Sequence, residues 1–183
     1  MNLFIDTHLN DVVIILSKNN EIIKKKIIQN EKQNSKIIMP TIKEILGIEK
    51  PTSIIVVNGP GSFTGVRLGI TIAKTLAYTL NIPIRTITSL ECLAISTDEA
   101  DKIVAFSDKN GYYIAIFNEK IELIGNYEYL SNTEFSEYCK KYNVLQNFDL
   151  NYEKIIKFAS LKKETIAHEV NPIYIKKIDV EKW

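Results

Sequence analysis

The feature that most limits the possible fold is a β-branched run followed at once by a glycine-rich turn and a long helical stretch. Residues 53–57 read Ser-Ile-Ile-Val-Val, a pattern typical of a strand buried on both faces. Residues 58–69 then hold four of the chain's seven glycines, and helical periodicity continues to about Leu80. A buried strand that leads through a turn into a helix is the unit of α/β proteins, so we expect a layered α/β fold.

Short apolar runs surround this unit. Residues 2–6, 12–16 and 21–28 predict three antiparallel strands, and the Lys-Lys-Lys run in the third is typical of a solvated edge strand. Helical spacing at 37–46, a strand at 83–87 and a helix at 89–95 complete the first half. The order β-β-β-α-β-α-β-α predicts a mixed sheet flanked by helices.

The second half repeats the opening pattern at an offset of roughly 100 residues, which indicates an internal duplication. Residues 104–108 and 2–6 are both short apolar runs closed by one Asp, and a similar pair of strands and a helix follow. We therefore expect one domain over residues 1–100 and a trimmed second domain over 101–183, with a short, irregular tail from residue 145. The two domains would face each other across a cleft, with Asp6 and Asp108 at equivalent strand ends.

Composition narrows the function classes. With 23 Lys+Arg against 22 Asp+Glu, the net charge of +1 argues against a free-standing nucleic-acid binder, so any RNA contact needs a partner. No apolar stretch approaches the ~18 residues of a membrane span, and no basic leader is visible. We expect a cytoplasmic protein without membrane contact. Cys92 and Cys139 lack metal-ligand spacing and are interpreted as reduced, structural thiols.

The glycine-rich loop leaves more than one function open. A glycine turn before a helix can bind an anion, so a nucleotide-binding enzyme remains an alternative. However, the loop lacks the Lys of a phosphate loop, and its G-x-G-x-x-x-G spacing differs from the dinucleotide fingerprint. A peptidase is less favoured, because Ser62 does not stand in a G-x-S-x-G elbow. The loop residues are Gly59, Pro60, Gly61, Ser62, Phe63 and Thr64.

The helix after the loop carries a stripe of small side chains at every fourth residue, from Gly65 to Ala77. Large apolar residues flank this stripe on both sides, so the helix is apolar around much of its girth. Either the helix at 37–46 fills the stripe, or both helices are shared with a second chain. The predicted partner interface comprises Ile38, Ile42, Ile45, Gly65, Val66, Arg67, Gly69, Ile70, Ala73 and Ala77. Arg67 is expected to bind either a partner's carboxylate or an internal acid.

Residues 59–69 resemble the G-P-G-S-F-T-G-L-R-I-G signature of the TsaB (YeaZ) family. Other segments agree in order. Residues 4–7 resemble the opening I-D-T-S, residues 88–94 resemble S-L-E-A-L-A, and residues 171–176 resemble the closing P-x-Y-L-R. The resemblance implies an actin-like ATPase (RNase H-like) fold of two duplicated domains with mixed sheets flanked by helices, the second domain being reduced.

The resemblance also implies a function. A member of this family is expected to be a non-catalytic scaffold that binds and activates a TsaD-type threonylcarbamoyltransferase. The product is threonylcarbamoyladenosine beside the anticodon of ANN-decoding tRNAs. A TsaE-like ATPase is the third component, and the chain is expected to contact tRNA only as part of the complex. No catalytic residue, metal ligand or cofactor of its own is expected, and the helices over roughly 35–46 and 64–80 form the interface. Alone, such an apolar face would pair into a homodimer.

Overall fold

The computed structural model describes residues 1–9, 11–29, 34–100, 102–146 and 149–175. Its first sheet has the strand order β3-β2-β1-β4-β5. The first three strands are antiparallel, and β4 and β5 run parallel to β1, as expected for a mixed sheet. The strands are β1 (Asn2–Asp6), β2 (Val12–Lys18), β3 (Glu21–Ile28), β4 (Ser53–Val57) and β5 (Ile84–Ile87).

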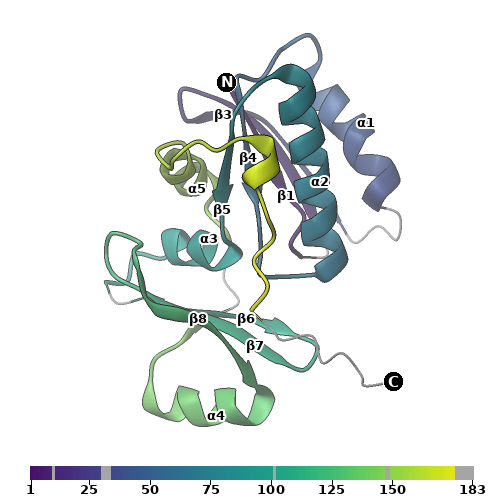
Figure 1. The fold of residues 1–183 in the computed structure, drawn as a ribbon. Helices are drawn as coiled ribbons and strands as arrows, with labels where there is room; N and C mark the ends of the chain where they lie inside the picture. The colour runs from purple at the N-terminus through teal and green to yellow at the C-terminus, as the bar shows by residue number, and fades with distance from the viewer. Residues whose placement is uncertain (10, 30–33, 101, 147–148, 176–183) are drawn as a thin grey trace, which may run out of the picture.

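Strand alternation divides the first sheet into two apolar faces. Leu3 and Ile5 point to a core formed with α1 (Asn34–Leu46) and α2 (Phe63–Leu80). Phe4 lies on the opposite face, which is covered by α5 (Tyr152–Ala159) and part of α3 (Ser89–Ser96). Figure 1 shows α1 and α2 side by side along one side of the sheet. Because β1 and β4 are buried on both faces, their sequences read as continuous apolar runs.

The second sheet has the order β8-β7-β6-β9, which matches β3-β2-β1-β4 strand for strand. The predicted duplication is therefore present in the topology. The repeat is reduced, because β9 has only two residues and the described residues contain no counterpart of β5. Its elements are β6 (Lys102–Asp108), β7 (Gly111–Phe117), β8 (Leu123–Ser131), α4 (Asn132–Lys141) and β9 (Leu145–Gln146).

The segment after residue 145 is more ordered than the sequence indicated. It contains α5, which begins at a side-chain cap from Asn151, and the short 3-10 helix η1 (Ala167–Glu169). Ile155, Ile156 and Ala159 form the buried stripe of α5 and pack under the first sheet. Their spacing is that of an amphipathic helix, and this signal was missed. The later chain also returns to the first sheet, where Thr165 pairs with Ile84. The division into domains 1–100 and 101–183 stays a prediction.

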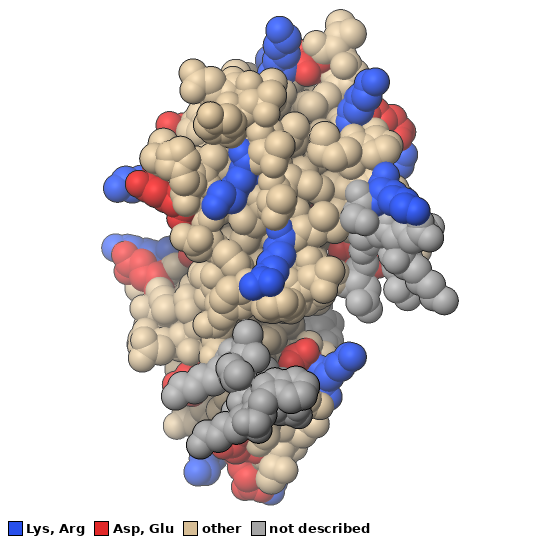
Figure 2. Space-filling view, turned by 45° about the vertical axis from the view of Figure 1, so that its right-hand side comes forward, with Lys and Arg blue, Asp and Glu red and all other residues tan. Residues whose placement is uncertain are grey.

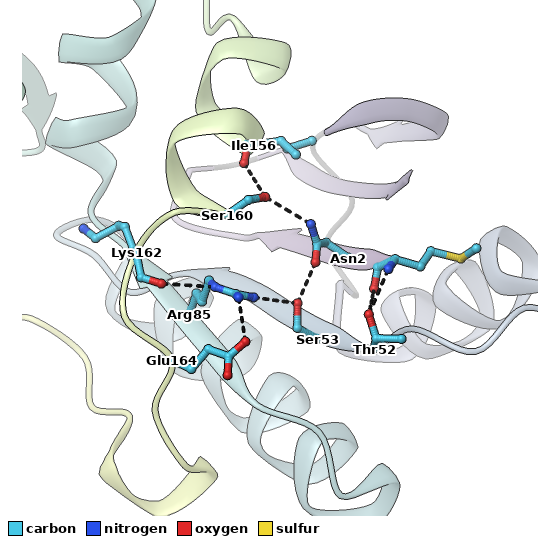
Figure 3. Close-up of polar contacts among 9 residues, drawn as sticks. Asn2, Thr52, Ser53, Arg85, Ile156, Ser160, Lys162 and Glu164 are labelled. Atoms are coloured by element: carbon cyan, nitrogen blue, oxygen red, sulfur yellow. Dashed lines mark hydrogen bonds and ion pairs between the residues drawn. The ribbon is translucent and has the colours of Figure 1, made fainter. Parts of the chain in front are cut away.

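Arg85 fastens this returning segment to the sheet (Figure 3). Its Nε donates to the carbonyl of Lys162 at 3.1 Å, Nη1 donates to Ser53 Oγ at 2.9 Å, and Nη2 pairs with Glu164 Oε1 at 2.5 Å. Ser53 Oγ in turn donates to Asn2 Oδ1 at 2.6 Å. Each of the three nitrogens of this guanidinium therefore makes a hydrogen bond within the chain.

No helix in the described part of the chain combines the length and the apolar character needed to cross a membrane.

Candidate functional site

Asp6 and Asp108, at the ends of the equivalent strands β1 and β6, line the same cleft, as the sequence predicted. The cleft has a volume of 1240 Å³ and lies between the two sheets. Asp108 accepts a hydrogen bond of 3.3 Å from the hydroxyl of Tyr129. Further carboxylates, Asp11 and Asp149, lie on the same walls, so the cleft is richer in acidic than in basic groups.

A buried histidine–carboxylate pair stands at the centre of this cleft. His8 Nδ1 lies 2.6 Å from Asp6 Oδ1, and the backbone N–H of His8 donates to the same oxygen at 3.1 Å. Asp6 therefore closes the turn that follows β1. Within the described residues, no group of three His, Cys, Asp or Glu side chains is placed to hold a metal ion.

Aromatic rings form the remaining walls. Phe106 from the second sheet meets the His8 ring edge-on at 5.8 Å between centroids, and Tyr152 from α5 closes the opposite side. Burial raises the pKa of Tyr152 far above its ordinary value, and the Asp6 carboxylate adds to the shift. The ammonium of Lys25 lies 4.3 Å from the centroid of the same ring. The ring contact between His8 and Phe106 thus links the two halves of the chain at the cleft.

The glycine-rich loop is packed against its own chain. The N–H of Ser62 donates to the carbonyl of His8 at 2.8 Å, and the Ser62 hydroxyl accepts from the N–H of Gly65 as the cap of α2. A Cβ on Gly61 would lie 2.5 Å from the His8 carbonyl oxygen, so glycine is required for this approach. Gly61 and the N–H of Ser62 therefore serve internal packing, which weakens the nucleotide-loop alternative.

The stripe of small residues also faces inward. A Cβ on Gly65 would overlap the carbonyl of Thr7, and one on Gly69 would overlap the Thr7 hydroxyl. Thr7 Oγ1 donates to the carbonyl of Gly65 at 2.7 Å. The stripe allows α2 to approach the end of β1, and neither α1 nor a second chain is needed to explain it.

Most of the predicted interface residues are buried in this chain's own core. Only Arg67 is exposed, and Gly65 is partly exposed. The others point toward the first sheet because the apolar stripes of α1 and α2 both cover it. The expectation that these side chains meet a partner directly therefore lacks support from their positions. The inward-facing residues are Ile38, Ile42, Ile45, Val66, Gly69, Ile70, Ala73 and Ala77.

Other positions of the same two helices are exposed and carry large apolar side chains. We call these residues the outer face: Met39, Phe63, Arg67 and Tyr78. Tyr78 is 76% exposed. Residues 50–90 contain no Asp or Glu. Figure 2, turned toward the side of α1 and α2, shows mostly uncharged surface with separate basic side chains and acidic groups near the margins. An aromatic residue on the polar side of a helix, such as Tyr78 on α2, was the sequence signal that could have found this face.

The chain has two sheets of matching strand order, with helices packed against them and a cleft between them. This is the architecture of the actin-like (RNase H-like) class of α/β proteins. A family model described as TsaD, tRNA N6-adenosine threonylcarbamoyltransferase, matches residues 21–173. The Bacillus subtilis tRNA threonylcarbamoyladenosine biosynthesis protein TsaB is 35% identical over 130 residues. The Haemophilus influenzae protein of the same name is 33% identical over 102 residues. The chain belongs to this family and, within it, to the TsaB/YeaZ proteins.

The extent of these matches differs between sequence and structure. The alignment covers 67% of this chain and 57% of the B. subtilis protein, and 50% of this chain and 43% of the H. influenzae protein. The chain thus spans little more than half of the first relative and less of the second. YeaZ from Pseudomonas aeruginosa superposes with a TM-score of 0.76 at 17% identity, covering 94% of this chain and 98% of that one. A second P. aeruginosa structure, described as similar to peptidase YeaZ, gives a TM-score of 0.80 at 16% identity, with 96% and 99% covered. These likenesses show a shared fold.

Proposed function

We propose that this chain is a non-catalytic subunit that binds and activates a TsaD-type threonylcarbamoyltransferase. The reaction served would form threonylcarbamoyladenosine next to the anticodon of ANN-decoding tRNAs. The names of the B. subtilis and H. influenzae relatives and the description of the matching family model support this assignment. The packing of the glycine loop against His8 supports a role without nucleotide chemistry of its own.

The observation that carries the proposal is the outer face of α1 and α2. Large apolar side chains are exposed on two adjacent helices, and residues 50–90, which include α2, contain no Asp or Glu. Such a surface is typical of a protein-binding site. The buried stripes of the same helices hold them against the sheet, so the outer face is presented on a rigid support. The proposed interface therefore uses the two helices that the resemblance implied, but its contacting residues are those of the outer face and not the buried stripes.

The test is complex formation between the full chain and the TsaD-type subunit of the same organism, measured by sedimentation velocity. We expect a one-to-one complex for the wild type and a loss of affinity of at least tenfold for Tyr78→Asp, because the variant places a charge in a desolvated contact. Leu161→Asp is the matched control, since Leu161 is 81% exposed but lies after α5, away from the outer face. Equal affinities for the wild type and Tyr78→Asp would contradict the proposed surface, and no wild-type complex would contradict the function.

The remaining partners follow from the same proposal. Alone, the chain is proposed to form a homodimer through the outer face, so the sedimentation coefficient should rise with concentration and Tyr78→Asp should stay monomeric. A TsaE-like ATPase and tRNA are proposed to join only after the two-protein complex has formed. Binding of either one by the isolated chain, in a pull-down with purified components, would contradict that order.

A further inference from the structure

The guanidinium of Arg67 is held in a fixed orientation at the start of α2. Its central carbon lies 3.9 Å from the centroid of the Phe63 ring and 5.6 Å from that of Tyr174. Arg67 Nε donates a hydrogen bond of 2.6 Å to the Tyr174 hydroxyl. Tyr174 follows Ile173, whose N–H donates to the carbonyl of Asn58 at 2.8 Å. Two segments far apart in sequence thus orient one exposed side chain.

The other edge of this guanidinium is open. Among the described residues, none accepts a hydrogen bond from the Nη groups of Arg67 or forms an ion pair with it. Arg85, the chain's other arginine, uses Nε and both Nη groups internally. Sequence reasoning left two partners open for Arg67, and within the described part of the chain no internal acid is paired with it.

The surroundings favour a carboxylate as the missing acceptor. Residues 50–90 hold four basic side chains and no acid, and of these Arg85 is paired and Lys74 Nζ donates to the carbonyl of Val170 at 3.0 Å. A nucleic-acid backbone is bound by arrays of cations, whereas Arg67 lies over the Phe63 ring and two of the other three basic residues of this stretch bond within the chain. A single arginine on aromatic rings is typical of the centre of a protein interface.

We propose that Arg67 is the specificity anchor of the outer face and binds one Asp or Glu carboxylate of the partner subunit through both Nη groups. Phe63 and Tyr174 act as positioning residues, because they fix the guanidinium before the partner arrives and so reduce the entropy lost on binding. The inference rests on the proposed function. It adds the chemistry that the partner must supply and gives the C-terminal segment around Tyr174 a role in recognition.

The experiment measures the dissociation constant of the full chain for the TsaD-type subunit by calorimetry. Arg67→Gln is expected to weaken binding about 10–100-fold, as loss of a buried charge-assisted pair does. Arg67→Lys should lose nearly as much, because an ammonium cannot form two parallel hydrogen bonds. Tyr174→Phe keeps the ring but removes the acceptor for Nε, and about a 2–5-fold loss is expected. Lys140→Gln on α4 is the control for net charge and should stay within about twofold.

Several outcomes would overturn the inference while the proposed function stands. These are wild-type affinity in Arg67→Gln, or full affinity in Arg67→Lys. Another is an Arg67→Gln variant that keeps its partner affinity but weakens tRNA binding by the complex. That result would mean that the Arg67 guanidinium binds a tRNA phosphate and not a carboxylate. Asp179→Asn with Glu181→Gln tests the acids beyond the described residues, and a loss equal to that of Arg67→Gln would indicate an internal pair. If the wild type forms no complex, the proposed function itself fails.

A double-mutant cycle identifies the acceptor. Each exposed Asp or Glu of the partner is changed to its amide in the presence of wild-type or Arg67→Gln chain. One partner carboxylate should lose its effect when Arg67 is already Gln, which is the signature of a direct pair. Additive effects for every partner carboxylate would overturn the inference.

Discussion

Thr7 and Gly69 are in contact so close that no side chain fits between them. The Thr7 hydroxyl occupies the space where a Cβ of Gly69 would lie, and it donates to the carbonyl of Gly65 one turn earlier. This contact joins the end of β1 to α2 and sets how near the helix lies to the sheet. It also explains the stripe of small residues without reference to any second chain.

Gly69→Ala is therefore expected to destabilise the fold by about 1–3 kcal/mol through overpacking. In an ordinary helix the same change stabilises by up to about 1 kcal/mol, so the sign itself is the test. The free energy of unfolding is measured by urea titration, with Thr71→Ala on the exposed side of α2 as control. Thr7→Ala should recover part of the loss when combined with Gly69→Ala. A more stable Gly69→Ala variant would show that the contact is absent.

Ile42 is buried and Met39 is exposed on α1, so the two positions should separate stability from binding. Ile42→Ala empties a fully buried position and is expected to cost about 2–5 kcal/mol. Met39→Ala removes an exposed side chain and should change stability by about 0.5 kcal/mol or less while weakening the partner complex. Urea titration and sedimentation give the two values. If Ile42→Ala instead weakened the complex and Met39→Ala lowered the stability, the buried stripe of α1 would be the binding surface.

Arg85→Ala should release the returning segment from the first sheet. We expect a loss of about 2 kcal/mol, because Ser53 and Glu164 lose their donor in a partly buried network. Hydrogen exchange at residues 160–170 should become faster, while exchange in β1 and β4 changes less. Arg67→Ala, which removes the exposed arginine, is expected to stay within about 1 kcal/mol. Unchanged exchange in Arg85→Ala would contradict the role of this network.

Tyr152 predicts a loss of stability at alkaline pH. Its pKa is raised in the folded chain by burial first and by the Asp6 carboxylate second, so folding favours the neutral phenol. This contribution is fully present below the ordinary tyrosine pKa of about 10 and is lost as pH rises above it. One such group changes the free energy of unfolding by at most about 1.4 kcal/mol per pH unit. Urea titrations from pH 8 to 11 should show a smaller slope for Tyr152→Phe, and equal slopes would contradict the prediction.

The sequence alone determined the elements before residue 145, their order and the duplication. The β-branched runs, the glycine turn and the repeated Asp-terminated strands depend on local spacing, and the sheet orders bear them out. Asp6 and Asp108 were placed on one cleft because equivalent strand ends of a duplicated unit meet at the same side. The elements after residue 144, namely β9, α5 and η1, were missed, although Ile155, Ile156 and Ala159 of α5 have helical spacing.

Tertiary structure decided which face of each helix is free. Periodicity shows that α2 is apolar around most of its girth, but it does not show which side the sheet covers. That choice depends on the close approach of Gly65 and Gly69 to Thr7, a contact between residues about sixty positions apart. The contacts that orient Arg67 could not be predicted from the sequence either, because Tyr174 lies 107 residues away along the chain. Such distant contacts depend on how the whole chain packs, and local patterns carry no record of them.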